Sequence, residues 1–394
     1  KESGTRTKYP TAIPATTSSD RRRYRHRRPS SVRRDRHSVT TPRTSSTRTA
    51  LRGIPGPSAL RISLKPATLD LDLVINAEGD PFTLDRTAEA IADWQLPNGM
   101  IPWFPGGHAD PWNHVEAAMA LDVVGMHGAA ERAYQWLADA QHPSGAWHQY
   151  YLADGIEQDK FDANTIAYVA AGVWHRWLLT GDRGFVEAMW PTVRAAIDFV
   201  LDLQTPRGEI LWARHADGTP WSFALLTGSS SMCHSLRCAV AVAELLGHER
   251  PDWELSVARL AAVIRAHCAG AAPDAFAPKA RWAMDWYYPV LCGVLRHGDA
   301  HTRMDARRDA FVVHGRGVRC VSDRPWITAA ETCECLMAEL SIGNTEQALA
   351  LFAWAQVLRD DDGHYWTGIV FPDEVHFPGD ERTTYTDAAV ILAA

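Results

Sequence analysis

Hydrophobic positions recur every three to four residues along most of this chain after about residue 85, which is the spacing of amphipathic helices. Alternating patterns typical of strands are scarce. The periodicity predicts twelve helices, at roughly 85–95, 111–126, 129–140, 162–180, 183–203, 231–247, 251–268, 286–296, 301–312, 327–341, 344–358 and 383–394. The sequence therefore predicts an all-α protein.

The connections between these helices alternate strictly between short and long. The short ones are centred on a glycine, as helix ends often are: Gly128, Gly181, Gly247, Gly298 and Gly343. The long ones span 96–110, 142–161, 204–230, 269–285, 313–326 and 359–382. Because consecutive helices of an up-and-down array reverse direction, we expect all six long loops on one rim. Loops of this length in a compact domain are usually functional.

The long loops contain an internal repeat. A glutamine, a Pro/Gly turn and a tryptophan recur at Gln95–Trp103, Gln141–Trp147 and Gln204–Trp212, with a looser copy at Gln356–Trp366. Two-helix repeats that close into a ring bury a continuous core. The pattern predicts an (α/α)6 toroid over residues 66–394, with the last helix incomplete because the sequence stops at Ala394 within it.

Charge separates the first 65 residues from the rest. Residues 1–65 contain 17 Lys and Arg and three acidic residues, a formal charge of +14, whereas the remainder carries −21. Because the segment is rich in Arg, Ser and Thr and poor in aliphatic residues, it is predicted to be a disordered tail; a nucleic-acid-binding arm is the alternative. The acidic remainder should bind no nucleic acid, and no apolar run approaches the ~18 residues of a membrane span.

All seven cysteines lie between Cys233 and Cys335, in odd number and without repeated spacing. This indicates reduced thiols and a cytoplasmic protein. Cys333-Glu334-Cys335 is not a metal motif, because positions two apart on a helix face different directions. Neither an H-E-x-x-H motif nor a glycine-rich phosphate loop is present, so we expect no metal and no cofactor.

Polar and aromatic residues concentrate where helices follow the long loops. Asp110 and Asp162 precede predicted helices, so capping is an alternative explanation for both. Glu331 is not explained by capping, because it lies inside its helix between apolar Ile327 and Leu336. Glycoside cleavage needs two carboxyl groups facing each other across the scissile bond, and our candidates for this catalytic pair are Asp110 and Glu331.

Further residues of this rim are expected to bind substrate. Flat aromatic rings suit the C–H faces of sugars, while carboxylates and amides accept or donate hydrogen bonds to hydroxyl groups. The candidates are Trp103, Trp112, His114, Glu116, Trp147, Asp162, Asn164, Asp285, Tyr287, Trp366 and Glu381.

Five segments give the chain a family resemblance: 99–121, 145–155, 162–175, 327–340 and 362–394. Over about 85–394 the chain resembles cytoplasmic actinobacterial proteins often labelled prenyltransferase-like, which are related to the mycobacterial methylmannose polysaccharide hydrolases and more distantly to glucoamylases. The resemblance implies a six-hairpin (α/α)6 glycosidase fold, a carbohydrate substrate with α-linkages and a glycosidase-type pair, carried over here onto Asp110 and Glu331.

Two alternatives stay open at this stage. Gln141-His-Pro-Ser-Gly145-Ala-Trp147 matches the Q-x-x-x-G-x-W repeat of triterpene cyclases and their toroidal relatives, but that repeat is structural. The D-x-D-D proton donor of a cyclase does not occur, and Asp360-Asp361-Asp362 does not fit the D-D-x-x-D of diphosphate-using enzymes. A toroid that binds glycans without cleaving them is the second alternative, because a fold does not dictate a function.

Overall fold

A computed structural model describes residues 84–394, so the predicted tail at 1–65 and the predicted start of the toroid at residue 66 lie outside the described residues. The helices are α1 (Leu84–Asp93), α2 (Pro111–Val123), α3 (His127–Ala140), α4 (Ala163–Ala167), α5 (Val169–Thr180), α6 (Arg183–Leu201), α7 (Leu226–Leu246), α8 (Pro251–Cys268), α9 (Ala283–Leu291), α10 (His297–Phe311), α11 (Ala329–Ser341), α12 (Thr345–Ala355) and α13 (Thr384–Ala393). Every predicted helix is present within about five residues at each end, although the one predicted at 162–180 is divided at Tyr168.

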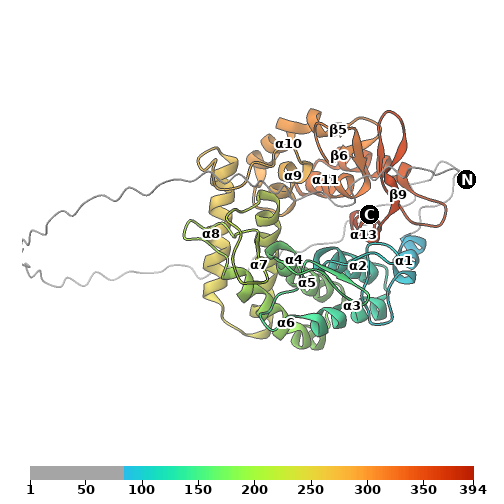
Figure 1. Cartoon of the computed structure of the whole chain (residues 1–394). Helices are drawn as coiled ribbons and strands as arrows, with labels where there is room; N and C mark the ends of the chain where they lie inside the picture. Colours follow the sequence, from blue (N-terminus) through green and yellow to red (C-terminus); the bar gives the residue numbers. More distant parts are fainter. Residues whose placement is uncertain (1–83) are drawn as a thin grey trace, which may run out of the picture. The chain divides into compact units, whose positions relative to one another are not determined.

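The helices form two concentric rings (Figure 1). In the inner ring α2, α4 with α5, α7, α9, α11 and α13 pack each against the next, and α13 packs back on α2. The outer ring consists of α1, α3, α6, α8, α10 and α12. The predicted (α/α)6 toroid is confirmed.

Residue size explains which helices lie inside. The inner helix α2 carries Ala117, Ala118 and Ala120, which are fully buried and let neighbouring helices approach closely. Outer helices bury one side only; in α10 the buried residues are Ala300, Met304 and Phe311. The core therefore lies between the two rings.

Each inner helix begins directly after a long loop, and each of these loops is hydrogen-bonded to the next around the ring. The contacts are Ala109 with Tyr151, Phe161–Asp162 with Ala213–Arg214, Ala277 N to Ala224 O, Ala283 N to Cys320 O, Trp326–Thr328 with Gly368–Val370, and Thr384 N to Trp103 O. The six long loops thus lie on one rim, as predicted. We call this closed series of contacts the rim circuit.

The rim also contains strands that the sequence pattern did not predict. A five-stranded antiparallel sheet runs in the order β5 (Val312–Val313), β6 (Gly317–Arg319), β7 (Trp326–Thr328), β8 (Trp366–Val370) and β9 (Val375–Arg382). Two strand pairs add β1 (Tyr150–Leu152) with β2 (Gly155–Gln158), and β3 (Phe161–Asp162) with β4 (Ala213–Arg214). The sequence pattern did not indicate these strands, because they are short; β3–β4 and β7–β8 also pair across different loops, whereas the other pairs form within one loop.

The glutamine repeat fastens three of the long loops to the outer ring. Gln141 Nε2 donates to Gly145 O at 2.8 Å and to Thr192 O of α6 at 3.0 Å. Gln95 and Gln204 make the same two kinds of bond, to α3 and to α8. Gly145 has φ +90° and packs so tightly that an added Cβ would lie 2.2 Å from Ala195 O. Only glycine fits this position.

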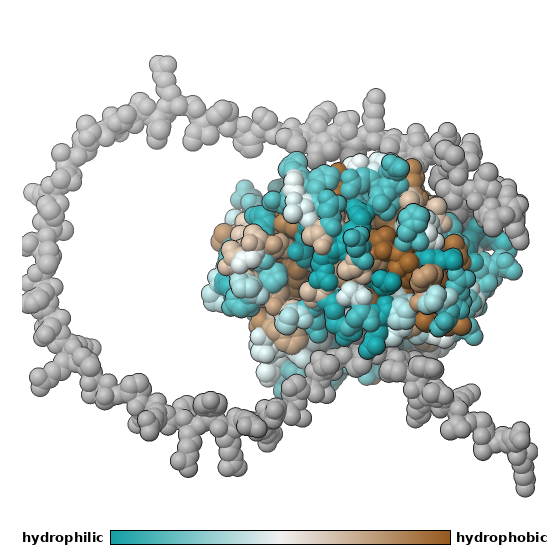
Figure 2. All heavy atoms as spheres, turned by 90° about the horizontal axis from the view of Figure 1, so that it is seen from above, coloured by the Kyte–Doolittle hydropathy of each residue, from teal (hydrophilic) through white to brown (hydrophobic). Residues whose placement is uncertain are grey.

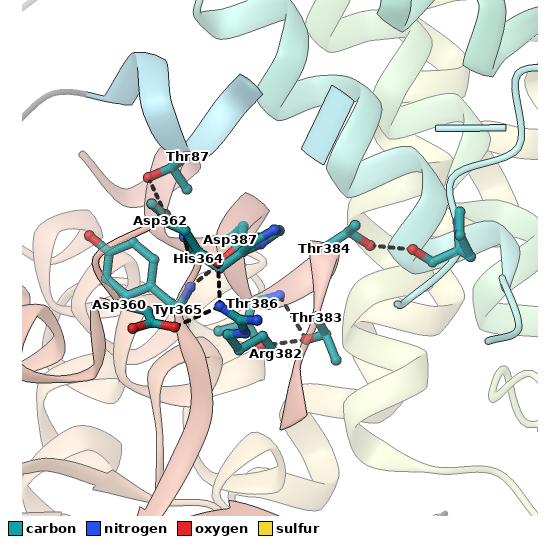
Figure 3. Close-up of polar contacts among 12 residues, drawn as sticks. Thr87, Asp360, Asp362, His364, Tyr365, Arg382, Thr383, Thr384, Thr386 and Asp387 are labelled. Atoms are coloured by element: carbon teal, nitrogen blue, oxygen red, sulfur yellow. Dashed lines mark hydrogen bonds and ion pairs between the residues drawn. The ribbon is translucent and has the colours of Figure 1, made fainter. Parts of the chain in front are cut away.

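The fourth copy of the repeat closes the ring (Figure 3). Gly363 O accepts a hydrogen bond from Thr87 Oγ1 of α1 at 2.8 Å, across 276 residues of sequence. Beside it His364 Nδ1 lies 2.6 Å from Asp387 Oδ2 of α13, and Arg382 pairs with Asp360. These contacts join the last repeat to the first.

Candidate active site

Asp110 occupies the position before α2 and is almost completely buried. Its Oδ1 caps the helix by accepting from Trp112 N at 2.9 Å and Asn113 N at 3.1 Å, while Oδ2 accepts from Trp103 Nε1 at 2.8 Å. Burial raises the pKa of Asp110 from 3.8 to about 6, although the three N–H donors oppose that rise. Asp110 is therefore both a cap and a carboxyl group with a shifted pKa.

Glu331 lies in the first turn of α11, directly after β7, and keeps part of its surface accessible. Its carboxylate accepts from Thr328 Oγ1. Burial raises the pKa of Glu331, and hydrogen bonds from the Thr328 hydroxyl and from its own backbone N–H oppose this only in part. A carboxyl group with two donors holds its proton more readily than one with three.

Tyr385, in the first turn of α13, lies within electrostatic range of both carboxyl groups. Burial is the main cause that raises the pKa of Tyr385, followed by the charge of Glu381 and then by those of Glu331 and Asp110. Its ring also lies 5.0 Å from that of Trp103. The structure therefore gathers Asp110, Glu331 and Glu381 around one tyrosine.

A second pair of carboxyl groups lies next to the first. Glu116 of α2 accepts from Trp112 Nε1 at 2.7 Å and from the Tyr168 hydroxyl at 3.2 Å. Burial raises its pKa to about 7, and the charge of Asp110 adds to the rise. Glu334 of α11 is buried and accepts from the hydroxyl groups of Tyr287 and Tyr288 of α9.

These two groups are close enough to influence each other. Burial raises the pKa of Glu334 well above its ordinary value, and the charge of Glu116 is the next cause. Since two neighbouring carboxylates repel each other, each raises the pKa of the other beyond the effect of burial.

Asp162 lies directly before α4, and its charge contributes to the raised pKa of Asp110. It caps that helix by accepting from Asn164 N at 3.0 Å. Burial raises the pKa of Asp162, while the nearby ammonium group of Lys160 lowers it. Lys160 Nζ lies 3.9 Å from the centre of the Trp212 ring. A cation over an aromatic face beside a carboxylate offers several contacts to a sugar.

Two predicted substrate-binding residues belong to the core, which corrects the expectation for both. Trp147 is fully buried and donates Nε1 to Leu137 O at 2.9 Å, so neither its ring nor its N–H is available to a ligand. His114 is buried between Ile101 N, 3.1 Å from Nδ1, and Ala133 O, 2.9 Å from Nε2. Both ring nitrogens are therefore occupied.

The remaining candidates lie around the rim at different depths. Tyr287 is fully buried and reaches the site through its hydroxyl group alone. Asp285 accepts from Thr227 Oγ1 at 2.8 Å, and Asn164 keeps a buried Oδ1 without a hydrogen-bond partner. Trp366 stacks on His376 at 3.9 Å, and Glu381 accepts from Thr367. Asn164, Asp285 and Trp366 lie at the rim, and their contacts with a substrate stay predictions.

Several residues of this centre were not among the site candidates named from the sequence, namely Tyr168, Tyr288, Glu334, Tyr385 and Lys160. Helical spacing could have found Glu334, because a residue three positions after Glu331 shares its side of the helix. Tyr168 and Tyr385 each lie one or two turns after a rim carboxylate. No local pattern indicates Lys160.

The outer surface has different features. A cavity of about 750 Å³ along α6 is lined by Trp190, Arg194 and His248 among others, and it contains none of the predicted site residues. The face in Figure 2 is mostly hydrophilic, with hydrophobic patches between, as expected of a surface in contact with water. Among helices of residues 84–394, none is both long and apolar enough to cross a membrane.

Solved structures place this architecture in a known class. A glycosidase matches with a TM-score of 0.64 at 14% identity, over 79% of this chain and 95% of its own. A GH63 mannosylglycerate hydrolase from Thermus thermophilus in complex with glucose matches with a TM-score of 0.62 at 13% identity, over 79% and 99%. The fold is that of the six-hairpin glycosidases.

Sequence comparison narrows the class to a family. No family model matches the chain. The MMP endo-(1,4)-3-O-methyl-alpha-D-mannosidase of Mycolicibacterium hassiacum is 50% identical over 327 residues, which are 82% of this chain and 89% of the relative. The chain belongs to the family of that mannosidase and is a glycoside hydrolase. This membership decides against the terpene-cyclase and non-catalytic alternatives.

Proposed function

We propose that the protein is an endo-acting α-mannosidase that cleaves (1,4)-linked 3-O-methylmannose polysaccharide. The observation that carries this proposal is the 50% identity to the M. hassiacum enzyme over nearly its whole length. The accumulation of aromatic rings and carboxyl groups at the rim supports a carbohydrate substrate. No cofactor is needed for such a hydrolysis.

For the chemistry we propose Glu331 as the general acid and Asp110 as the base that activates water. Three N–H donors favour the charged form of Asp110, and its pKa of about 6 leaves it ionised at neutral pH. Glu331 has fewer donors, the Thr328 hydroxyl and its own backbone N–H, and burial raises its pKa, as a proton donor requires. Glu331 would protonate the glycosidic oxygen while Asp110 removes a proton from the attacking water.

Product analysis tests this function. The full chain is incubated with (1,4)-linked 3-O-methylmannose oligosaccharides of defined length, and the fragments are measured by mass spectrometry. Internal fragments are expected, whereas release of single residues from one end would contradict endo action. The Glu331→Gln protein should bind the oligosaccharide but yield no product; a folded, fully active variant would exclude Glu331 as the acid.

We also propose that the enzyme works in a reducing compartment such as the cytoplasm. All seven cysteines are free, and six of them are buried. A native mass measured with and without reductant should show no disulfide-dependent difference.

A further inference from the structure

Three aromatic side chains next to Asp110 form what we call the aromatic cluster, consisting of Trp112, Tyr168 and Tyr288. The ring of Trp112 lies 5.7 Å from that of Tyr168 and 6.0 Å from that of Tyr288. They come from α2, from the break between α4 and α5, and from α9, so three inner helices meet at this point. Trp112 and Tyr168 keep accessible surface, whereas Tyr288 is buried behind them.

Every polar hydrogen of the cluster is already used. Trp112 Nε1 and the Tyr168 hydroxyl both donate to Glu116 Oε1, and the Tyr288 hydroxyl donates to Glu334. Burial raises the pKa of Tyr168 first of all, and the charges of Glu116 and Glu334 raise it further, so its hydroxyl stays protonated. The two carboxyl groups therefore hold the polar tips, and the accessible surface that the cluster offers is mainly ring.

Such a surface distinguishes sugars that present a hydroxyl group from sugars that present a methyl ether at the same position. A hydroxyl group placed against it loses water and finds no free polar hydrogen on the rings. A methyl ether has no O–H to satisfy and gains apolar contact instead, which is worth about 0.8 kcal/mol per buried carbon or more in a well-formed pocket. The cluster is suited to a methylated sugar.

We propose that Trp112 and Tyr168, supported by Tyr288, contact the 3-O-methyl group of the mannose residue beside the scissile bond and set the preference for methylated over unmethylated substrate. This inference rests on the proposed function. It assigns substrate specificity to the aromatic cluster, in which Trp112 lies two residues after the candidate base Asp110. Glu116 acts as a positioning residue, because it holds two of the three rings.

The test compares kcat/KM for (1,4)-linked mannose oligosaccharides of equal length with and without 3-O-methyl groups. The wild-type full chain should prefer the methylated series about tenfold or more. Tyr168→Gln, which replaces the ring with a polar chain, should lower that ratio at least about fivefold. Tyr168→Phe is the matched control: it keeps the ring and loses only the hydroxyl, so it should retain the ratio whatever its kcat.

The outcomes separate the two proposals. Absence of cleavage in both series would overturn the proposed function itself. Cleavage of both series with equal kcat/KM would overturn the inference alone, as would a ratio that falls equally in Tyr168→Phe and Tyr168→Gln. If Tyr168→Gln does not fold, saturation-transfer NMR on the inactive Glu331→Gln protein decides. The O-methyl protons should then receive the strongest transfer, and the weakest transfer at that group would refute the contact.

Discussion

Replacing Asp110 by Asn separates its two roles, since the amide oxygen can still cap α2 but cannot take a proton. Asn keeps an acceptor for Trp112 N and Asn113 N. Its amide nitrogen would replace Oδ2 and face Trp103 Nε1, which is itself a donor. The variant therefore loses the charge and one hydrogen bond, while the backbone cap remains.

The expected change in stability is small because two effects oppose each other. A pKa of about 6 instead of 3.8 means that, between about pH 4 and pH 6, the folded protein keeps a proton on Asp110 that the unfolded chain has already released. Stability from this group is thus fully present below about pH 4 and is lost as pH rises through 6, the loss amounting to about 3 kcal/mol at neutral pH. Asn removes that penalty, whereas the donor–donor contact with Trp103 costs about 1–3 kcal/mol.

Activity should respond far more strongly than stability. Without a base on water, kcat is expected to fall about 10²–10⁴-fold while oligosaccharide affinity stays nearly unchanged. Thermal unfolding at pH 7, calorimetric binding and product analysis measure the three quantities. A folded Asp110→Asn protein with normal kcat would refute the catalytic role. A loss of more than about 3 kcal/mol in the free energy of unfolding, with intact specific activity, would show that Asp110 has a structural role only.

Three other substitutions, one of them a control, and one truncation test further parts of the chain. Trp103→Phe removes a hydrogen-bond donor from Asp110, so the pKa of Asp110 should rise. The acidic limb of the kcat/KM–pH profile should then move up by about one pH unit from near pH 6, and an unmoved limb would contradict this. Gly145→Ala should lower the free energy of unfolding, measured in urea, by about 3 kcal/mol or more, because its Cβ would meet Ala195 O. Gly181→Ala is the control: it has φ +65° but open space around it, so it should lose about 1–2 kcal/mol. Equal losses would argue against the tight contact at Gly145. Removing residues 1–65 should leave the Tm and the activity of the remaining chain unchanged and confer no DNA binding on it, which a filter-binding assay over a salt series checks; salt-sensitive binding by the shortened chain would show that the acidic body itself holds nucleic acid.

Helical periodicity and loop lengths were sufficient to predict the toroid. The spacing of apolar residues shows which side of each helix is buried, and the alternation of short and long loops shows at which end of the helical array each loop lies. Periodicity could not predict β5 to β9. Those strands have between two and eight residues, too few for a clear alternating pattern, and β7 pairs with β8 from another loop about 40 residues away. The break at Tyr168 was missed for a related reason, since apolar residues continue through it without interruption.

The candidate site was predicted in part. Asp110 and Glu331 lie around one tyrosine, a proximity that no local pattern encodes. Trp147 was wrongly expected to bind substrate, although its place in the glutamine repeat already indicated a structural role. Glu334 was overlooked although it shares a side of its helix with Glu331, whereas its proximity to Glu116 of another helix is encoded by no local pattern.

The closure between Thr87 and Gly363 has a consequence for synthesis in the cell. A ribosome must translate 276 further residues after Thr87 before its partner Gly363 exists, and α2 receives α13 only once Thr384–Ala393 has been made. Until then the growing chain is an open arc with two uncovered apolar edges, one at α2 and one at its latest repeat. Such edges favour association with other nascent chains or capture by chaperones, so this enzyme's yield should depend on translation rate and temperature more than that of a protein whose contacts are local.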